Sequence, residues 1–121
     1  MRIEHANITV TNVNASVAFY QKLFGAHIRW QGTTSAGNRA AHVGVEDTYL
    51  SLFEADSEGR APAGYEKVGF NHLGFEVDSL DHFRTLLGDL GVEPTEVEEY
   101  EPGSRLYFFD PDGNEIELIE Y

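Results

Sequence analysis

Apolar and polar residues alternate over residues 3–10 with the two-residue period of a half-buried strand. One face of this strand is apolar, whereas the other carries polar side chains that begin with His5. A helical spacing of apolar residues follows, with Asn14 or Ser16 as the capping residue at its start and Gly25 as its stop. The pattern predicts a strand followed by a helix that covers the apolar face of that strand.

Three more strands are expected in the first half of the chain, because glycine-rich and acidic turns separate short strand-like stretches at residues 26–31, 39–45 and 48–54. Residues 1–55 would then form one module with the order strand, helix, three strands. The next stretch, residues 56–69, combines glycine, proline, charged and small side chains, a composition typical of a linker. The boundary between modules is therefore expected there.

The second half of the chain, residues 70–121, repeats the order of the first. Its helix is expected to begin near Ser79, to bury a stripe of leucine and phenylalanine residues, and to end at Gly91. Its strands are expected at residues 70–77, 95–100, 104–109 and 114–120. Eight strands and two helices in two such halves indicate one α+β domain, in which neither half buries its sheet well alone.

The clearest repeat joins two strands that each begin with histidine. His5 opens the stretch His-Ala-Asn-Ile-Thr-Val, which returns about 67 positions later as His-Leu-Gly-Phe-Glu-Val from His72. Each half then closes on a similar strand, in which Ser51 of the first half takes the place that Glu117 fills in the second. The repeat therefore puts two histidines and one glutamate at related places.

These three residues share a face as well as a position in the repeat. The strand neighbours of opposite parity are apolar, so His5, His72 and Glu117 all point away from the helix-covered face. Glu54 has the opposite parity to Ser51 and is expected on the helix-covered face. A lone strand histidine is more often structural, but three ligand-type residues on matching strands favour a site for one divalent ion, with Zn, Fe, Mn or Ni all suited to imidazole and carboxylate.

The composition excludes several classes of protein. With 121 residues, of which 41% are hydrophobic, the chain is long enough for one compact domain. It has no cysteine, which rules out disulfides, a thiolate nucleophile and cysteine-ligated metal clusters. A net charge of -13 argues against binding to nucleic acid or to an anionic membrane surface. With neither a leader pattern nor an apolar run of the roughly 20 residues that span a bilayer, a cytoplasmic protein is expected.

Four stretches of the sequence resemble the vicinal oxygen chelate superfamily, which includes glyoxalase I, extradiol dioxygenases, fosfomycin resistance proteins and bleomycin-binding proteins. They begin at His5, Ser16, Asn71 and Tyr107, and they read His-Ala-Asn-Ile-Thr-Val, Ser-Val-Ala-Phe-Tyr-Gln-Lys-Leu-Phe-Gly, Asn-His-Leu-Gly-Phe-Glu-Val and Tyr-Phe-Phe-Asp-Pro-Asp-Gly-Asn-Glu-Ile-Glu-Leu. The resemblance covers essentially the whole chain. It is specific for the superfamily and unspecific for the reaction.

The resemblance implies two paired βαβββ modules that form a cup-shaped mixed sheet, with the helices on the outside and a divalent metal ion within. His5, His72 and Glu117 match the ligand positions of the family. Ser51 stands at the fourth position, a glutamate in glyoxalase I, and a serine hydroxyl is a poor ligand, which argues against the glyoxalase I reaction. Two histidines and one carboxylate are left, as in the extradiol dioxygenases and the fosfomycin resistance enzymes.

The resemblance also suggests residues that meet the substrate. Tyr107 matches a cavity-facing tyrosine of the fosfomycin resistance enzymes and is expected to act as a hydrogen-bond donor or acid. Arg105 shares its face by parity and is expected to anchor an anionic group of the substrate. The alternatives are that Tyr107 is a packed core residue and that Arg105 is a surface residue. Aromatic residues on strands are more often core residues than cavity residues. The residues expected to line the substrate cavity are Asn7, Trp30, Tyr49, Ser51 and Phe53.

Other polar positions narrow the substrate or have structural explanations. Glu101 and Val97 stand near places where the fosfomycin resistance enzymes would need small polar or basic residues, so fosfomycin itself is disfavoured. The Asp-Pro-Asp-Gly stretch from Asp110 has turn chemistry and is expected to be structural. His42 lies in the third predicted strand and could turn toward the cavity.

Two functions from different classes follow from these features. The first is a metal-dependent glyoxalase-like enzyme, either a lyase, isomerase or transferase or a ring-cleaving dioxygenase, that acts on a small molecule with two neighbouring oxygen atoms. The alternative is a metal-free drug-binding resistance protein of the bleomycin-binding type, for which the acidic composition favours a cationic ligand. The resemblance further implies a homodimer, because relatives commonly share ligands between two subunits.

Overall fold

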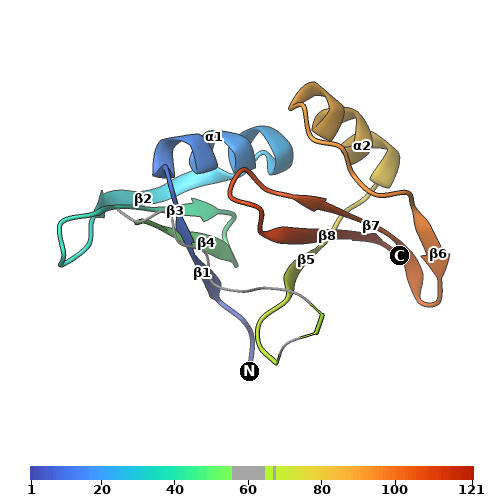
Figure 1. Cartoon of the computed structure of the whole chain (residues 1–121), viewed down its shortest axis with the longest axis horizontal. Coiled ribbons are helices and arrows are strands. Elements are labelled where there is room, and N and C mark those ends of the chain that lie inside the picture. The colour runs from blue at the N-terminus through green and yellow to red at the C-terminus, as the bar shows by residue number, and fades with distance from the viewer. Residues whose placement is uncertain (56–64, 67) are drawn as a thin grey trace. The chain divides into compact units, whose positions relative to one another are not determined.

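The computed structural model describes residues 1–55, 65–66 and 68–121, and the chain divides into two compact units, Met1–Gly59 and Arg60–Tyr121 (Figure 1). Each unit contains one strand, one helix and three further strands, in that order. The predicted α+β class with two βαβββ modules is therefore confirmed. Most of the predicted linker lies outside the described residues, and the predicted cup, which requires both units, stays a prediction.

Unit 1 is a four-stranded mixed sheet with one helix. Its elements are β1 (His5–Val10), α1 (Val13–Phe24), β2 (His27–Thr33), β3 (Arg39–Gly44) and β4 (Tyr49–Glu54). The strand order is β1-β4-β3-β2, with β1 parallel to β4 and the other pairs antiparallel. The last strand of the unit is therefore inserted beside the first, which brings β1 and β4 side chains into register.

Unit 2 repeats this topology. Its elements are β5 (His72–Glu76), α2 (Leu80–Asp89), β6 (Glu98–Tyr100), β7 (Gly103–Phe109) and β8 (Glu115–Glu120). The order β5-β8-β7-β6, with β5 parallel to β8, is the same as in unit 1. Positions in the two units can therefore be compared one by one.

The apolar face of each sheet packs against the helix of its own unit. α1 contacts β3 and β4, and α2 contacts β7 and β8. The buried side chains of unit 1 include Tyr20, Leu23, Ala41, Val43 and Leu52. Those of unit 2 include Leu80, Leu87, Leu106, Phe108, Ile116 and Leu118. Burial of these groups stabilises each unit. The opposite face of each sheet, called the open face below, is left for polar side chains.

The start of α1 differs from the prediction, whereas its end does not. Asn12, rather than Asn14 or Ser16, caps the helix: its backbone is extended and its side chain accepts from Ala15 N at 2.9 Å. Ser16 is buried inside the helix. Gly25 ends the helix in the left-handed conformation (φ 63°), as predicted, because glycine adopts this conformation without a steric penalty.

Two glutamates at equivalent positions bind the first backbone N–H group of the two helices. Val13 N donates to Glu54 at 2.9 Å, and Leu80 N donates to Glu120 at 2.8 Å. A carboxylate is favourable at a helix N-terminus, where N–H groups lack partners within the helix. The prediction that Glu54 lies on the helix-covered face is thus confirmed, and Ser79 caps α2 as predicted.

Strand β6 is shorter than the predicted 95–100. Thr95 N donates to Tyr107 O at 2.8 Å, but Tyr107 N donates to the Thr95 hydroxyl at 3.0 Å, so a side chain replaces a backbone carbonyl where the ladder would continue. The turn from Asp110 is structural, as predicted, because the buried Asp110 carboxylate accepts from Asp112 N and from both nitrogens of Asn114. No helix in the described part of the chain is both long and apolar enough to cross a bilayer.

Candidate metal centre

His72 and Glu117 meet on the open face of the unit 2 sheet. His72 Nε2 lies 3.0 Å from Glu117 Oε2, and the two side chains are 26% and 12% exposed. The residues come from the parallel strands β5 and β8, where Glu117 is in register with Gly74. A Cβ atom on Gly74 would lie 3.4 Å from Glu117 Oε2, an ordinary van der Waals contact, so the carboxylate lies directly over Gly74. The sheet register thus pairs two of the three predicted ligands.

The two ring nitrogens of His72 have different partners. Nδ1 lies 2.7 Å from Oδ1 of Asn71, an acceptor, and this contact favours the tautomer with a proton on Nδ1. If Nε2 had no proton, its lone pair would face a carboxylate oxygen at 3.0 Å, and two acceptors repel at that distance. A proton or a metal ion between Nε2 and Oε2 removes the repulsion. One nitrogen and one oxygen donor held in this way fit a divalent ion.

Arg105 and Tyr107 of β7 flank this pair. Arg105 NH1 donates to Glu117 Oε1 at 3.0 Å, and the arginine side chain is 13% exposed. The Tyr107 ring packs edge-on against His72, with ring centroids 5.6 Å apart. Four residues predicted for the site, two as ligands and two as substrate contacts, therefore form one cluster. Within the described residues of unit 2, no third histidine or carboxylate joins His72 and Glu117 to complete a metal site.

His5, the third predicted ligand, belongs to unit 1 and is held in a similar way to His72. Its Nδ1 atom lies 2.6 Å from Glu4 Oε2, and its ring stacks on Tyr49 with centroids 5.1 Å apart. The hydrogen bond with His5 holds the pKa of the Glu4 carboxyl below its usual range. In both histidines the Nδ1 atom contacts the side chain of the residue directly before it in the sequence. The meeting of His5 with His72 and Glu117 stays a prediction.

The carboxylate position of unit 2 is a hydroxyl in unit 1. Ser51 is in register with Asn7 and buried, and its Oγ atom accepts from Asn7 Nδ2 at 3.1 Å. Asn7 occupies the place of Gly74, and Ser51 occupies the place of Glu117. The two predicted cavity residues therefore satisfy each other and form a neutral pair.

A row of rings crosses the same face of unit 1. A register shift in β2 between Ile28 and Trp30 pairs Trp30 with His42, which places the indole on the face opposite α1. The ring centroids of Trp30 and His42 are 5.0 Å apart, and those of His42 and Tyr49 are 4.6 Å apart. A Cβ atom on Gly32 would lie 2.4 Å from the Trp30 ring, so glycine is required for the indole to lie flat. Phe53, 38% exposed, shares the face of Ser51 by parity.

The environment of His42 disfavours its charged form. Burial lowers the pKa of the His42 imidazole, and the positive charges of His5 and Arg29 lower it further. The Arg29 guanidinium lies 4.3 Å from the centre of the Tyr49 ring, a cation–π contact. His42 therefore reaches the polar face, as the sequence allowed, and it does so as a neutral ring near pH 7.

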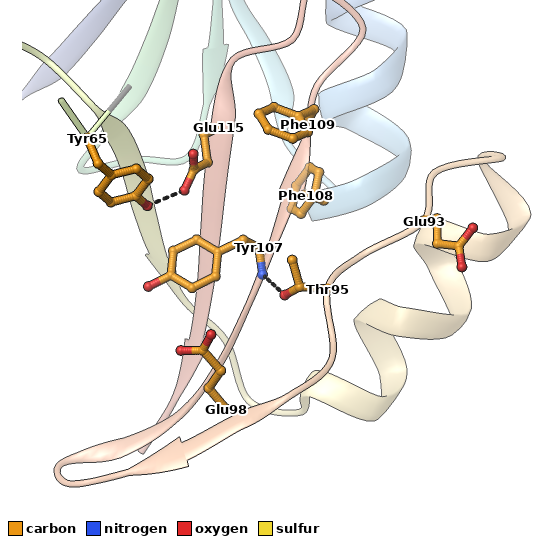
Figure 2. A pocket seen from close by; sticks show the side chains of 8 residues that line it. All are labelled: Tyr65, Glu93, Thr95, Glu98, Tyr107, Phe108, Phe109 and Glu115. Atoms are coloured by element: carbon orange, nitrogen blue, oxygen red, sulfur yellow. Dashed lines mark hydrogen bonds between the residues drawn. The ribbon is translucent and has the colours of Figure 1, made fainter. Parts of the chain in front are cut away.

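A pocket of about 400 Å³ opens beside Tyr107 in unit 2 (Figure 2). Its wall is acidic and aromatic, and its lining residues are Tyr65, Glu93, Thr95, Glu98, Tyr107, Phe108, Phe109 and Glu115. The Tyr65 hydroxyl donates to Glu115 at 2.5 Å, and this bond, with burial, raises the pKa of Tyr65 to about 12. Tyr65 is therefore a protonated donor at neutral pH.

Sequence reasoning missed Asn71 and Glu4, which orient the two histidines, and Tyr65, which lines the pocket. Asn71 and Glu4 had a signal that could have been used, because each precedes a repeat-related histidine and carries a side-chain oxygen. Tyr65 had none, since its contact with Glu115 joins residues 50 positions apart.

Comparisons with known proteins show the family of the chain and proteins of similar sequence and fold. Residues 2–118 match the family described as Glyoxalase/Bleomycin resistance protein/Dioxygenase superfamily. The chain is 26% identical to "Metallothiol transferase FosB" of Shouchella clausii, over 96% of this chain and 77% of that protein. It is 26% identical to "Glutathione transferase FosA" of Serratia marcescens, over 96% and 78%. The crystal structure of a glyoxalase family protein from Enterococcus faecalis superposes with a TM-score of 0.84 at 24% identity, over 98% of this chain and 97% of that one.

Proposed function

Because the chain belongs to the Glyoxalase/Bleomycin resistance protein/Dioxygenase superfamily, as its resemblance to the vicinal oxygen chelate superfamily predicted, we propose that it is a metal-dependent enzyme. Its substrate is a small molecule with two neighbouring oxygen atoms. The observation that carries the proposal is the contact of His72 Nε2 with Glu117 Oε2 at 3.0 Å, which holds one nitrogen ligand and one oxygen ligand side by side. The names of the relatives, a metallothiol transferase and a glutathione transferase, favour transfer of a thiol group over lyase or dioxygenase chemistry.

Three side chains would hold the ion. His72 offers Nε2, Glu117 offers Oε2, and His5 offers Nε2 because its Nδ1 is engaged by Glu4. When bound, a divalent ion acts as a Lewis acid that polarises a substrate oxygen. Ser51 adds no fourth ligand, because its hydroxyl is paired with Asn7. The proposed metal is one of Zn, Fe, Mn or Ni.

The remaining side chains of the site orient the substrate and move protons. Tyr107, edge-on to His72, is placed to donate a hydrogen bond or a proton to a group near the ion. Asn7, Ser51 and the rings of Trp30, Tyr49 and Phe53 form the proposed substrate face of unit 1. Anchoring of an anionic substrate group by Arg105 stays a prediction, because NH1 of Arg105 already donates to Glu117.

Metal analysis tests the proposal directly. Protein purified without chelator should contain a stoichiometric divalent ion, and His72→Ala should lose it. His82→Ala is the matched control, because His82 is exposed on α2, away from the unit 2 pair. Wild-type protein that takes up no Zn²⁺, Mn²⁺, Ni²⁺ or Fe²⁺ during dialysis would remove the enzymatic proposal.

Substrate assays sharpen the reaction class. The metal-loaded protein should consume a thiol when given small electrophiles that carry adjacent oxygens, and EDTA should abolish this. Fosfomycin should be a poor substrate, because Glu101 and Val97 stand near places where the fosfomycin resistance enzymes would need small polar or basic residues. Efficient, EDTA-sensitive opening of fosfomycin would contradict that expectation.

The proposal extends to a homodimer in which His5 of one subunit joins His72 and Glu117 of the other. This arrangement completes the ligand set without requiring that one chain bring all three side chains together. Sedimentation of the metal-loaded protein should give the mass of a dimer. A monomer at micromolar concentration would count against shared sites.

A second candidate is a metal-free protein that binds a cationic drug. The pocket beside Tyr107 favours it, because Glu93, Glu98 and Glu115 surround aromatic rings that suit an organic cation. Titration calorimetry with bleomycin in EDTA would test it, with Glu98→Gln as the pocket variant and the exposed Glu96→Gln as control. Micromolar binding that ignores EDTA and weakens only in Glu98→Gln would favour sequestration over catalysis.

A further inference from the structure

We propose that Arg105 is a positioning residue of the metal centre, which binds one oxygen of Glu117 so that the other faces the ion. The inference rests on the proposed function. It starts from two bonds of one carboxylate: Arg105 NH1 lies 3.0 Å from Oε1, and His72 Nε2 lies 3.0 Å from Oε2. Arg105 of β7 therefore contacts one oxygen of the carboxylate, and His72 of β5 contacts the other.

Burial strengthens the hydrogen bond between Arg105 NH1 and Glu117 Oε1. The side chains of Arg105 and Glu117 are only 13% and 12% exposed, so water competes weakly for their hydrogen bond. Loss of the guanidinium would leave Oε1 without this donor and would let the carboxylate rotate. Because Oε1 is engaged, Oε2 is the oxygen available to an ion, and the rest of the coordination sphere is left to the histidines and the substrate.

The repeat supplies an internal comparison for this role. By strand register, the position of Arg105 in unit 2 corresponds to Ala40 in unit 1, and Glu117 corresponds to Ser51. Unit 2 has both Glu117 and Arg105, whereas unit 1 has Ser51 and Ala40 at the two equivalent positions. Arginine at this position is therefore not required by the βαβββ scaffold, which folds with alanine there in unit 1.

The test is a double-mutant cycle read by metal affinity rather than by turnover. Zn²⁺ affinity is measured by competition with a chromophoric chelator for wild type, Arg105→Met, Glu117→Gln and the double variant. Arg105→Met should weaken Zn²⁺ binding about 10–100-fold, the usual effect of removing a group that orients a ligand. In the Glu117→Gln background the same change should alter affinity by no more than about twofold, because Arg105 acts through Glu117.

Controls separate this role from folding and from simple charge. Arg84→Met removes an exposed arginine of α2 and should leave Zn²⁺ affinity unchanged. Arg105→Lys, which retains a donor and the charge, should recover part of the loss, and it replaces Arg105→Met if that variant fails to fold. Unchanged or tighter Zn²⁺ binding in Arg105→Met, or an equal loss in both backgrounds, would overturn the inference alone. Wild-type protein that binds neither Zn²⁺ nor Mn²⁺ would overturn the proposed function and the inference with it.

Discussion

The two units share a scaffold but differ in the chemistry of their open faces. Both have a glutamate, Glu54 or Glu120, that binds the first N–H of the helix, and both insert the last strand beside the first. On the open face, unit 1 has Asn7, Ala40, His42 and Ser51 where unit 2 has Gly74, Arg105, Tyr107 and Glu117. The glutamate that binds the helix N-terminus is the same in both halves, whereas these residues of the open face are not.

This difference has a physical basis. The helix-covered face must bury apolar groups and satisfy the helix terminus, which leaves few acceptable side chains. The open face has no such requirement, so it can carry either a neutral set, as in unit 1, or a charged set, as in unit 2. The charged set includes the Glu117 carboxylate, whose two oxygens lie 3.0 Å from His72 Nε2 and 3.0 Å from Arg105 NH1.

The largest expected effect comes from giving unit 1 the carboxylate of unit 2. Ser51→Glu buries a carboxylate where Ala40 offers no guanidinium, and an unpaired buried charge costs about 3 kcal/mol or more. Urea denaturation in EDTA should show this loss in free energy of unfolding. Ser51→Gln, of the same size but neutral, is the control. Equal free energies of unfolding for Ser51→Glu and Ser51→Gln would show that a carboxylate at this position does not need an arginine beside it.

A smaller and symmetrical effect is expected at the shared glutamates. Glu54→Ala and Glu120→Ala each remove a charged acceptor from a helix N-terminus, so each should lower the free energy of unfolding by about 1–2 kcal/mol. Glu96→Ala, at an exposed position outside helices and strands, should have almost no effect. A loss at only one of the two glutamates would break the structural equivalence of the units.

The sequence predicted the scaffold well because parity and repeats are local properties. Parity alone put Glu54 on the helix-covered face and grouped Arg105 with Tyr107, and the resemblance to the superfamily put Tyr107 in the cavity with Glu117. Parity could not predict that Arg105 binds Glu117, because the register pairs Arg105 with Ile119 and the contact is diagonal.

The errors arose where a neighbouring element decides the outcome. Asn12, Asn14 and Ser16 are all good capping residues, and only the extended backbone of Asn12 selects it. The register shift before Trp30 depends on the pairing of β2 with β3, which the sequence of β2 does not reveal. The partners of the histidine Nδ1 atoms depend on side-chain rotamers.

The smallest expected effect concerns the neutral ring row of unit 1. Burial and the charges of His5 and Arg29 lower the pKa of His42 in the folded state, while Glu4 opposes this. Below pH 6.5, His42 therefore binds more protons in the unfolded chain than in the folded one. The contribution of His42 to the free energy of unfolding is complete above its ordinary pKa of 6.5 and is lost as the pH falls below that value. His42→Tyr, which copies Tyr107 of unit 2, should reduce the slope of unfolding free energy against pH below 6.5. An unchanged slope in EDTA, or an NMR titration of His42 above 6.5, would contradict the assignment.

The most direct test of the metal centre is a crystal structure of the protein grown with Mn²⁺, with the ion located by anomalous scattering. We predict one ion bound by His5 Nε2, His72 Nε2 and Glu117 Oε2, contributed by one chain or by two, with Arg105 still bound to Glu117 Oε1. An ion held by other residues, or a fully ordered site in which His72 and Glu117 bind each other and no ion, would contradict it.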